Sequence, residues 1–216
     1  MSDEFGYAAV KVILLITAVV VVVVFIVYDR RRRVALAYRA AIVARLGWSL
    51  APPDPWLVTV ATRLGVPGQP ARMFTGDFDG RRLFVIDFEL TPTDGEGLAH
   101  LIGLTLPGKL PPLTVSPDVR LERLLGQDIE LESQAFNDTF RVQGYSGRFA
   151  SAVLQPRLME WMLHNSRLRW HIAGNILVTW ELFELTMPEV MARLETMAGV
   201  IDRIPRFVFR DDWTVA

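Results

Sequence analysis

Apolar residues are densest near the N-terminus of the chain. The stretch from Val12 to Tyr28 reads VILLITAVVVVVVFIVY and contains no charged residue. Together with the residues from Tyr7 onward it makes a run whose length, as a helix, is about 33 Å, enough for a bilayer core of about 30 Å. In lipid the backbone must satisfy its hydrogen bonds internally, so a helix is expected despite the many valines. The pattern predicts a transmembrane helix over residues 7–28.

The charges that flank this run predict its orientation. Only Lys11 lies at its N-terminal end, whereas four arginines follow it: Arg30, Arg31, Arg32 and Arg33. The positive-inside rule then places the N-terminus outside and the rest of the chain in the cytoplasm, as a single-pass protein of the plasma membrane. The same arginines are expected to contact anionic lipid head groups, which makes the bilayer a partner. A cleaved signal peptide is the alternative, but Asp3 and Glu4 precede the run where a basic start is needed.

Helical periodicity continues beyond the arginines. Apolar residues recur every fourth position from Val34 to Leu46, and Gly47 follows as a possible C-cap. The sequence therefore predicts three regions: an N-terminal flank and span over 1–29, a basic collar and amphipathic stem helix over 30–47, and a globular domain over 48–216.

Alternating patterns begin after a short helix. Asp54 as N-cap and Pro55 at the first position predict a helix that ends near Leu64. The Asp79-Gly80 pair predicts a hairpin with strands over 73–78 and 82–90. A third strand is expected over 98–106. The proline-rich PGKLPP is expected to break the chain before a brief strand over 113–115 and a short helix from Ser116 to Leu125.

The second half of the chain predicts further short elements. Strands are expected over 128–131 and 139–143 around a Phe136-Asn137 turn, and helices over 147–154 and 157–164. RLRWHIAGNILVTWELF predicts a second hairpin that turns at Gly174-Asn175. Thr186 and Glu189 form a capping box for a last helix that runs to Ile204. Meanders of strands with interspersed helices predict an α+β domain with a mostly antiparallel sheet, short helices and a C-terminal helix, preceded by the single transmembrane helix.

Composition narrows the function classes. The chain has 216 residues, 51% of them hydrophobic, a formal charge of −1 and no cysteine. Disorder is excluded for most of the chain, and so are disulfides, thiolate metal sites and a cysteine nucleophile. Removing the five basic and three acidic residues of positions 1–33 from 23 and 24 leaves 18 and 21, a charge of −3. This balance argues against nucleic acid as a partner.

Candidate chemistry is sparse. The three histidines lack metal-ligand spacing, and neither a hydrolase elbow nor a phosphate-binding loop occurs in the sequence. No catalytic, metal-binding or cofactor-binding residue and no cofactor is therefore predicted. Polar clusters that are candidates for a ligand site are also explained by turn chemistry or by the wet face of a strand. They are Asn137, Asp138, Arg167, Arg169 and His171.

Several distinctive strings carry a resemblance. They include LPGKLPPLTVSP, ESQAFNDTFRV, FASAVLQPRLMEWML and IDRIPRFVFRDDW, with GWSL and FTGDFDGRRLFVIDF upstream. These strings resemble an uncharacterised family of membrane-anchored proteins from high-GC Gram-positive bacteria, in which an apolar helix and an arginine cluster precede a domain of unknown function. The resemblance implies the same architecture and implies no catalytic residue, cofactor or substrate.

Three functions follow as hypotheses. The preferred one is a membrane-anchored, non-enzymatic module whose cytoplasmic domain binds or scaffolds a partner. The alternative is an accessory subunit of an integral-membrane complex, with a membrane protein as partner. The second alternative is a membrane-surface hydrolase that uses the carboxylates of Asp138 and Glu160.

Overall fold

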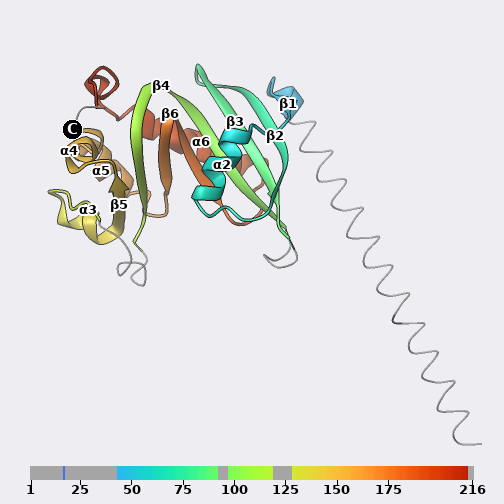
Figure 1. Ribbon diagram of the computed structural model, residues 1–216, viewed down its shortest axis with the longest axis horizontal. Helices are drawn as coiled ribbons and strands as arrows, with labels where there is room; N and C mark the ends of the chain where they lie inside the picture. Colours follow the sequence, from blue (N-terminus) through green and yellow to red (C-terminus); the bar gives the residue numbers. More distant parts are fainter. Residues whose placement is uncertain (1–16, 18–42, 92–96, 119–127, 214–216) are drawn as a thin grey trace, which may run out of the picture. The chain divides into compact units, whose positions relative to one another are not determined.

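The computed structural model describes Thr17 and residues 43–91, 97–118 and 128–213 (Figure 1). The chain divides into two units, Met1–Leu46 and Gly47–Ala216, and each is described by itself. In the first unit residues 43–45 are helical, and Gly47 at the start of the second has a φ of 74°, in keeping with the predicted C-cap. The rest of the predicted stem lies outside the described residues.

The predicted fold class needs a correction at the N-terminus. Within the described residues no helix is both long enough and apolar enough to cross a membrane. The described fold is an antiparallel sheet with helices, and no transmembrane helix is found in it. Apart from Thr17, the predicted span over 7–28 lies outside the described ranges. Its prediction rested on length and hydropathy, whereas the β-branched valines that dominate the run are weak helix formers in water.

The second unit is built on a six-stranded antiparallel sheet. Its strands are β1 (Ser49–Ala51), β2 (Gln69–Phe78), β3 (Arg81–Glu89), β4 (Leu98–Pro117), β5 (Phe140–Gly144) and β6 (Trp170–Glu181). The order is β1-β2-β3-β4-β5, and β6 also pairs with β4. The α+β prediction is therefore confirmed for this domain.

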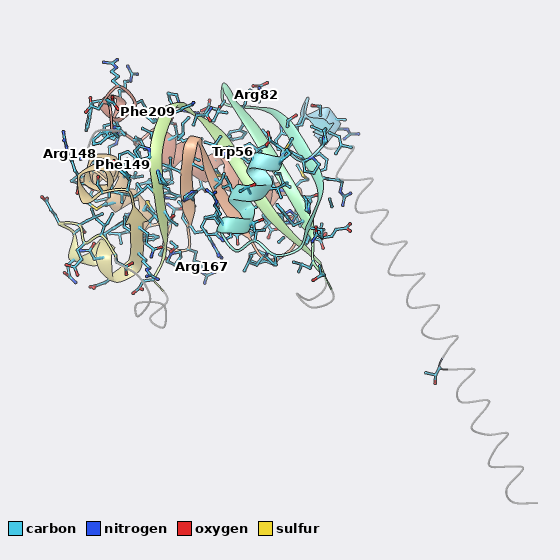
Figure 2. All side chains as sticks on the ribbon, in the orientation of Figure 1. Trp56, Arg82, Arg148, Phe149, Arg167 and Phe209 are labelled. Atoms are coloured by element: carbon cyan, nitrogen blue, oxygen red, sulfur yellow. The ribbon has the colours of Figure 1, made fainter. Side chains whose placement is uncertain are left out.

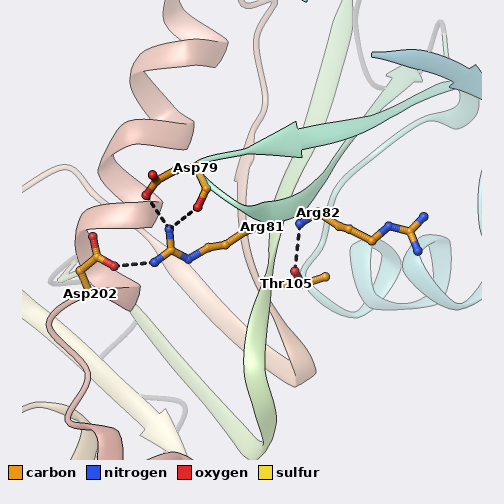
Figure 3. A network of polar contacts seen from close by, with 5 residues as sticks. All are labelled: Asp79, Arg81, Arg82, Thr105 and Asp202. Atoms are coloured by element: carbon orange, nitrogen blue, oxygen red, sulfur yellow. Dashed lines mark hydrogen bonds and ion pairs between the residues drawn. The ribbon is translucent and has the colours of Figure 1, made fainter. Parts of the chain in front are cut away.

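The β2–β3 hairpin forms where the sequence predicted it. Asp79 and Gly80 have φ values of 50° and 72°, the left-handed pair that a two-residue turn requires. Arg81 then links this turn to the end of helix α6 (Met187–Ile201): its guanidinium contacts the Asp79 carboxylate at 2.7 Å and also the Asp202 carboxylate. Figure 3 shows both contacts, together with the Arg82 amide donating to the Thr105 hydroxyl. Arg81 therefore links the β2–β3 turn to the C-terminal end of α6.

The predicted break at PGKLPP is wrong, because β4 is one strand of 20 residues. β3 pairs with it as far as Leu104, and β5 begins to pair at Leu113. The prolines between these residues lack an N–H, but on that edge no neighbouring strand needs one, and on the β6 edge the register shifts between Leu110 and Leu113. Ser116 and Pro117 also belong to β4, so they do not open a helix; residues 119–127 lie outside the described ranges.

The second predicted hairpin is also wrong, because β6 is continuous. Gly174 has a φ of 60° and pairs with Leu110 between two shifts of register. The left-handed glycine therefore accommodates a bulge, where the strand bends without reversing. In Figure 1 β4 rises, turns over and descends, and β6 follows it. We call the part with β1, β2 and β3 the first limb, and the part with β5 the second limb.

Helices cover both faces of the first limb (Figure 1). Helix α2 (Pro55–Arg63) begins at Asp54, whose carboxylate accepts from the Trp56 amide at 2.8 Å, as the sequence predicted. It packs on one face through Leu57, Val60 and Ala61. Helix α6 contacts β4 and β6 and covers the opposite face. It begins with the predicted capping box.

The second limb carries the remaining helices: α3 (Gln134–Thr139), α4 (Gly147–Val153), α5 (Pro156–Leu163) and the 3-10 helix η2 (Arg206–Phe209). The predictions for α4, α5 and β5 are confirmed. Two others are wrong: Phe136 and Asn137 lie within α3 and not in a turn, and residues 128–131 form no strand. Ser133 starts α3 by accepting from the Phe136 amide, and this local cap favours a helix over the predicted turn.

Candidate functional site

A row of polar side chains crosses the first limb beneath α6. Asp87 on β3 lies opposite His100 on β4, and His100 lies opposite Glu181 on β6. Arg72 on β2 lies opposite Asp87 and extends the row to a fourth strand. Residues directly opposite one another share a face, so the four side chains are neighbours. Asp87 and His100 are fully buried, and Glu181 is 3% exposed.

His100 uses both of its ring nitrogens inside the protein. The backbone amide of Leu185 donates to Nε2 at 3.1 Å, and Nδ1 lies 2.9 Å from the Asp87 carboxylate. Because an amide can only donate, Nε2 must accept, and the ring proton is on Nδ1, where it is donated to Asp87. His100 therefore connects the sheet to the loop that joins β6 to α6.

Arginines balance the charge at both ends of the row. The Arg72 Nε lies 3.9 Å from the Asp87 carboxylate. At the other end the Arg193 guanidinium, from α6, lies 2.7 Å from the Glu181 carboxylate, and Arg169 lies 3.8 Å from it. A buried carboxylate needs such partners, and removing one would leave an uncompensated charge. We call these six residues the polar row: Arg72, Asp87, His100, Arg169, Glu181 and Arg193.

The polar row has the composition of a general-base dyad but the geometry of a structural network. In a catalytic dyad the second ring nitrogen faces a nucleophile or a water. In this protein the second nitrogen of His100 is occupied by the Leu185 amide, and the ring has no exposed surface. Among the described residues, no group of three or more His, Asp or Glu side chains is placed to hold a metal ion. The polar row links β2, β3, β4 and β6 to the loop after β6 and to helix α6.

Asn137 and Asp138, two of the predicted ligand-site candidates, form hydrogen bonds within their own segment of the chain. Both ends of the Asn137 amide bond the backbone of Leu131, at 3.1 Å to its N–H and 2.7 Å to its carbonyl. Asp138 accepts from the Gln134 side chain one turn earlier, at 3.0 Å. Asn137 thus fastens the segment before α3, and Asp138 is a surface carboxylate. Glu160, the other carboxylate of the hydrolase hypothesis, is exposed on α5.

The other three predicted ligand-site candidates, Arg167, Arg169 and His171, do not form one continuous surface. Arg169 belongs to the polar row, and its guanidinium also lies 5.6 Å from the centre of the Trp180 ring. The Nδ1 of His171 lies 2.8 Å from the Thr114 hydroxyl on β4, and burial lowers the pKa of His171 to about 4. Arg167 is exposed in the segment before β6. The four arginines at 30–33 lie outside the described residues.

The polar row was missed in the sequence because its members are far apart in the chain. Asp87 and Glu181 each interrupt an apolar strand pattern, LFVIDFEL and ILVTWE, and His100 is alone in a third. A charged residue within an apolar strand is a usable signal, since it needs a buried partner. Only the register of β3, β4 and β6 shows that Asp87, His100 and Glu181 are partners of one another.

Comparisons with known proteins yield one likeness in structure. No family model matches the chain, and no curated protein matches it. The fold is similar to the crystal structure of the mycobacterial trehalose monomycolate transport factor A, TtfA, with a TM-score of 0.55 and 13% sequence identity. The similarity covers 77% of this chain and 94% of that one. At this identity the comparison establishes the fold.

Proposed function

We propose that this protein is a membrane-associated, non-enzymatic factor in lipid transport, which acts by binding a partner of the transport machinery. The observation that carries the proposal is the likeness to the transport factor TtfA, which extends over 94% of that protein's chain. A likeness over almost a whole domain means that the two proteins share the surfaces on which binding sites can be built, although their residues differ.

The polar row supports binding over catalysis. Catalytic acids and bases must reach a substrate, but Asp87, His100 and Glu181 are buried and face one another. Asp138, the first candidate for the hydrolase hypothesis, is exposed, and its carboxylate accepts from the Gln134 side chain of the same helix. A binding factor, by contrast, needs a rigid scaffold, and a buried network that joins four strands to a helix provides one.

Family membership and position in the cell remain predictions. The resemblance to the uncharacterised membrane-anchored family rests on strings such as IDRIPRFVFRDDW. The cytoplasmic position of the domain rests on residues 30–33, outside the described ranges. Both agree with a factor that serves a lipid transporter from the inner side of the membrane.

Complementation tests the proposed function. The full chain is expressed in mycobacterial cells depleted of TtfA, and transport of trehalose monomycolate is measured. We expect transport to be restored in part. A chain that is present at the membrane in normal amounts but restores no transport would contradict the proposal.

A paired variant separates binding from hydrolysis. Asp138→Ala with Glu160→Ala removes both candidate carboxylates, and because both are exposed the change in stability should stay within about 0.5 kcal/mol. We expect this variant to restore transport as well as the parent chain. Loss of transport by a folded double variant would favour the hydrolase instead.

A further inference from the structure

Cationic and aromatic side chains gather where the bend of β4, the start of α4 and η2 meet. Tyr145 is 45% exposed and Phe207 is 46% exposed. Four cationic residues of the same three segments are also exposed. We call this set the basic aromatic surface: Lys109, Tyr145, Arg148, Arg206, Phe207 and Arg210.

Buried contacts hold the three segments together. Trp213 packs edge-on against Phe149 of α4, with ring centres 5.2 Å apart, and its indole N–H donates to the Val208 carbonyl in η2 at 2.8 Å. A Cβ on Gly108, in the bend of β4, would lie 3.3 Å from the Phe209 carbonyl, so bend and η2 are in contact. Figure 2 shows Arg148, Phe149 and Phe209 at this end of the domain. The surface is therefore preorganised.

The basic aromatic surface has a local excess of positive charge. Elsewhere arginines such as Arg72, Arg81 and Arg193 form ion pairs with carboxylates. Among the described residues none of the four cations of the basic aromatic surface forms such a pair; Arg148 lies over the Trp213 ring, 5.8 Å from its centre. Two acids, Asp211 and Asp212, follow η2, which leaves a local excess of two positive charges. The chain after position 33 has a formal net charge of −3, so the positive excess belongs to this end of the domain and not to the domain as a whole.

We propose that the basic aromatic surface docks on a bilayer that contains anionic phospholipid, an inference that rests on the proposed membrane-associated function. Arginine guanidiniums bind phosphate through paired hydrogen bonds, and lysine adds a point charge. Tyrosine and phenylalanine rings insert at the level of the head groups, where one side is apolar and the other wet. A protein interface would instead place a continuous apolar centre inside a polar rim, whereas here two rings stand among four cations.

A single fluorescent label reports this contact, because the chain has no cysteine of its own. Phe207→Cys in the full chain is labelled with an apolar fluorophore and mixed with vesicles whose lipids carry a quencher. The vesicles contain phosphatidylcholine alone or with phosphatidylserine. We expect quenching that depends on phosphatidylserine. The matched control is Phe183→Cys, which replaces another exposed ring, 54% exposed, in the loop after β6; it should show no such dependence.

Charge variants complete the test. Arg206→Gln with Arg210→Gln should weaken the contact about 25-fold, since each arginine near an anionic surface contributes about fivefold. Arg63→Gln with Arg167→Gln removes two other exposed arginines and should leave the quenching unchanged; Figure 2 shows Arg167 away from Arg148. The inference is overturned if both labels are quenched alike, if phosphatidylserine has no effect, or if the label at 207 responds only when membrane proteins are added. Any of these results alongside restored trehalose monomycolate transport would remove this surface and keep the proposed function.

Discussion

At the scale of single residues, His171 gives the domain a pH dependence. Burial lowers its pKa from 6.5 to about 4, so between these values the unfolded chain binds a proton that the folded chain does not. Stability is then unaffected above about pH 6.5 and falls as the pH drops from there to about 4, by at most about 3 kcal/mol. His171→Gln removes the titration and can keep the hydrogen bond to Thr114. Urea unfolding across this range should show a flatter profile for the variant; an unchanged slope would contradict the assignment.

Residue roles could be predicted from the sequence only where the partners are local. Asn137 was identified as a residue typical of turns and caps, and it does bond nearby backbone, that of Leu131. His100 could not be placed, because its partners are Asp87, 13 residues earlier, and Leu185, 85 residues later. No pattern within a single strand contains either distance. The polar row is therefore a property of strand register.

At the scale of elements, the position of the Phe84 ring of β3 over the neighbouring strand β4 depends on Gly103. It lies opposite Phe84, and a Cβ at this position would stand 1.9 Å from the Phe84 ring. Gly103→Ala should push the ring out of its position and destabilise the domain by about 1–3 kcal/mol. Phe84→Leu in the same chain should recover part of that loss, as a double-mutant cycle of denaturant unfolding would show.

Gly147→Ala is the matched control for the glycine. At this position a Cβ would meet only Ile129, at an ordinary 3.8 Å, and alanine suits the first turn of α4. Its stability should not fall. If Gly103→Ala were equally harmless, the Phe84 ring would not be confined by β4.

Elements specified by a local signal were predictable and those specified by a distant partner were not. The Asp79-Gly80 turn and the capping box of α6 each lie within four residues; in the box, hydrogen bonds from the Thr186 side chain and backbone lower the pKa of Glu189. The prolines of β4 and Gly174 of β6 were interpreted as breaks because breaks are their usual local meaning. Each strand continues because the other pairs with it on both sides of the bend, and at Leu110 and Gly174 within it.

At the scale of the whole domain, the mixture of elements predicted the α+β class but not the order of the strands. Sequential neighbours β1 to β5 do pair in chain order, as a meander predicts. β6 is the exception, because it returns to β4 after α3, α4 and α5 and takes the edge opposite β3 and β5. That return closes the domain, and it joins residues at least 55 positions apart, beyond the reach of any local pattern.

Because β6 pairs with β4 in both limbs, we expect the two limbs to unfold together. β4 and β6 run through both, so neither limb can lose its pairing without exposing the edge of the other. Ile172→Ala, at a fully buried position of β6 in the second limb, should cost about 2–5 kcal/mol. Native-state hydrogen exchange should show the same loss at the amide of Val85 on β3, in the first limb, as at Val142 on β5. If Val85 kept its protection while Val142 lost it, the limbs would be separate cooperative units and the continuous strands would act as a hinge between them.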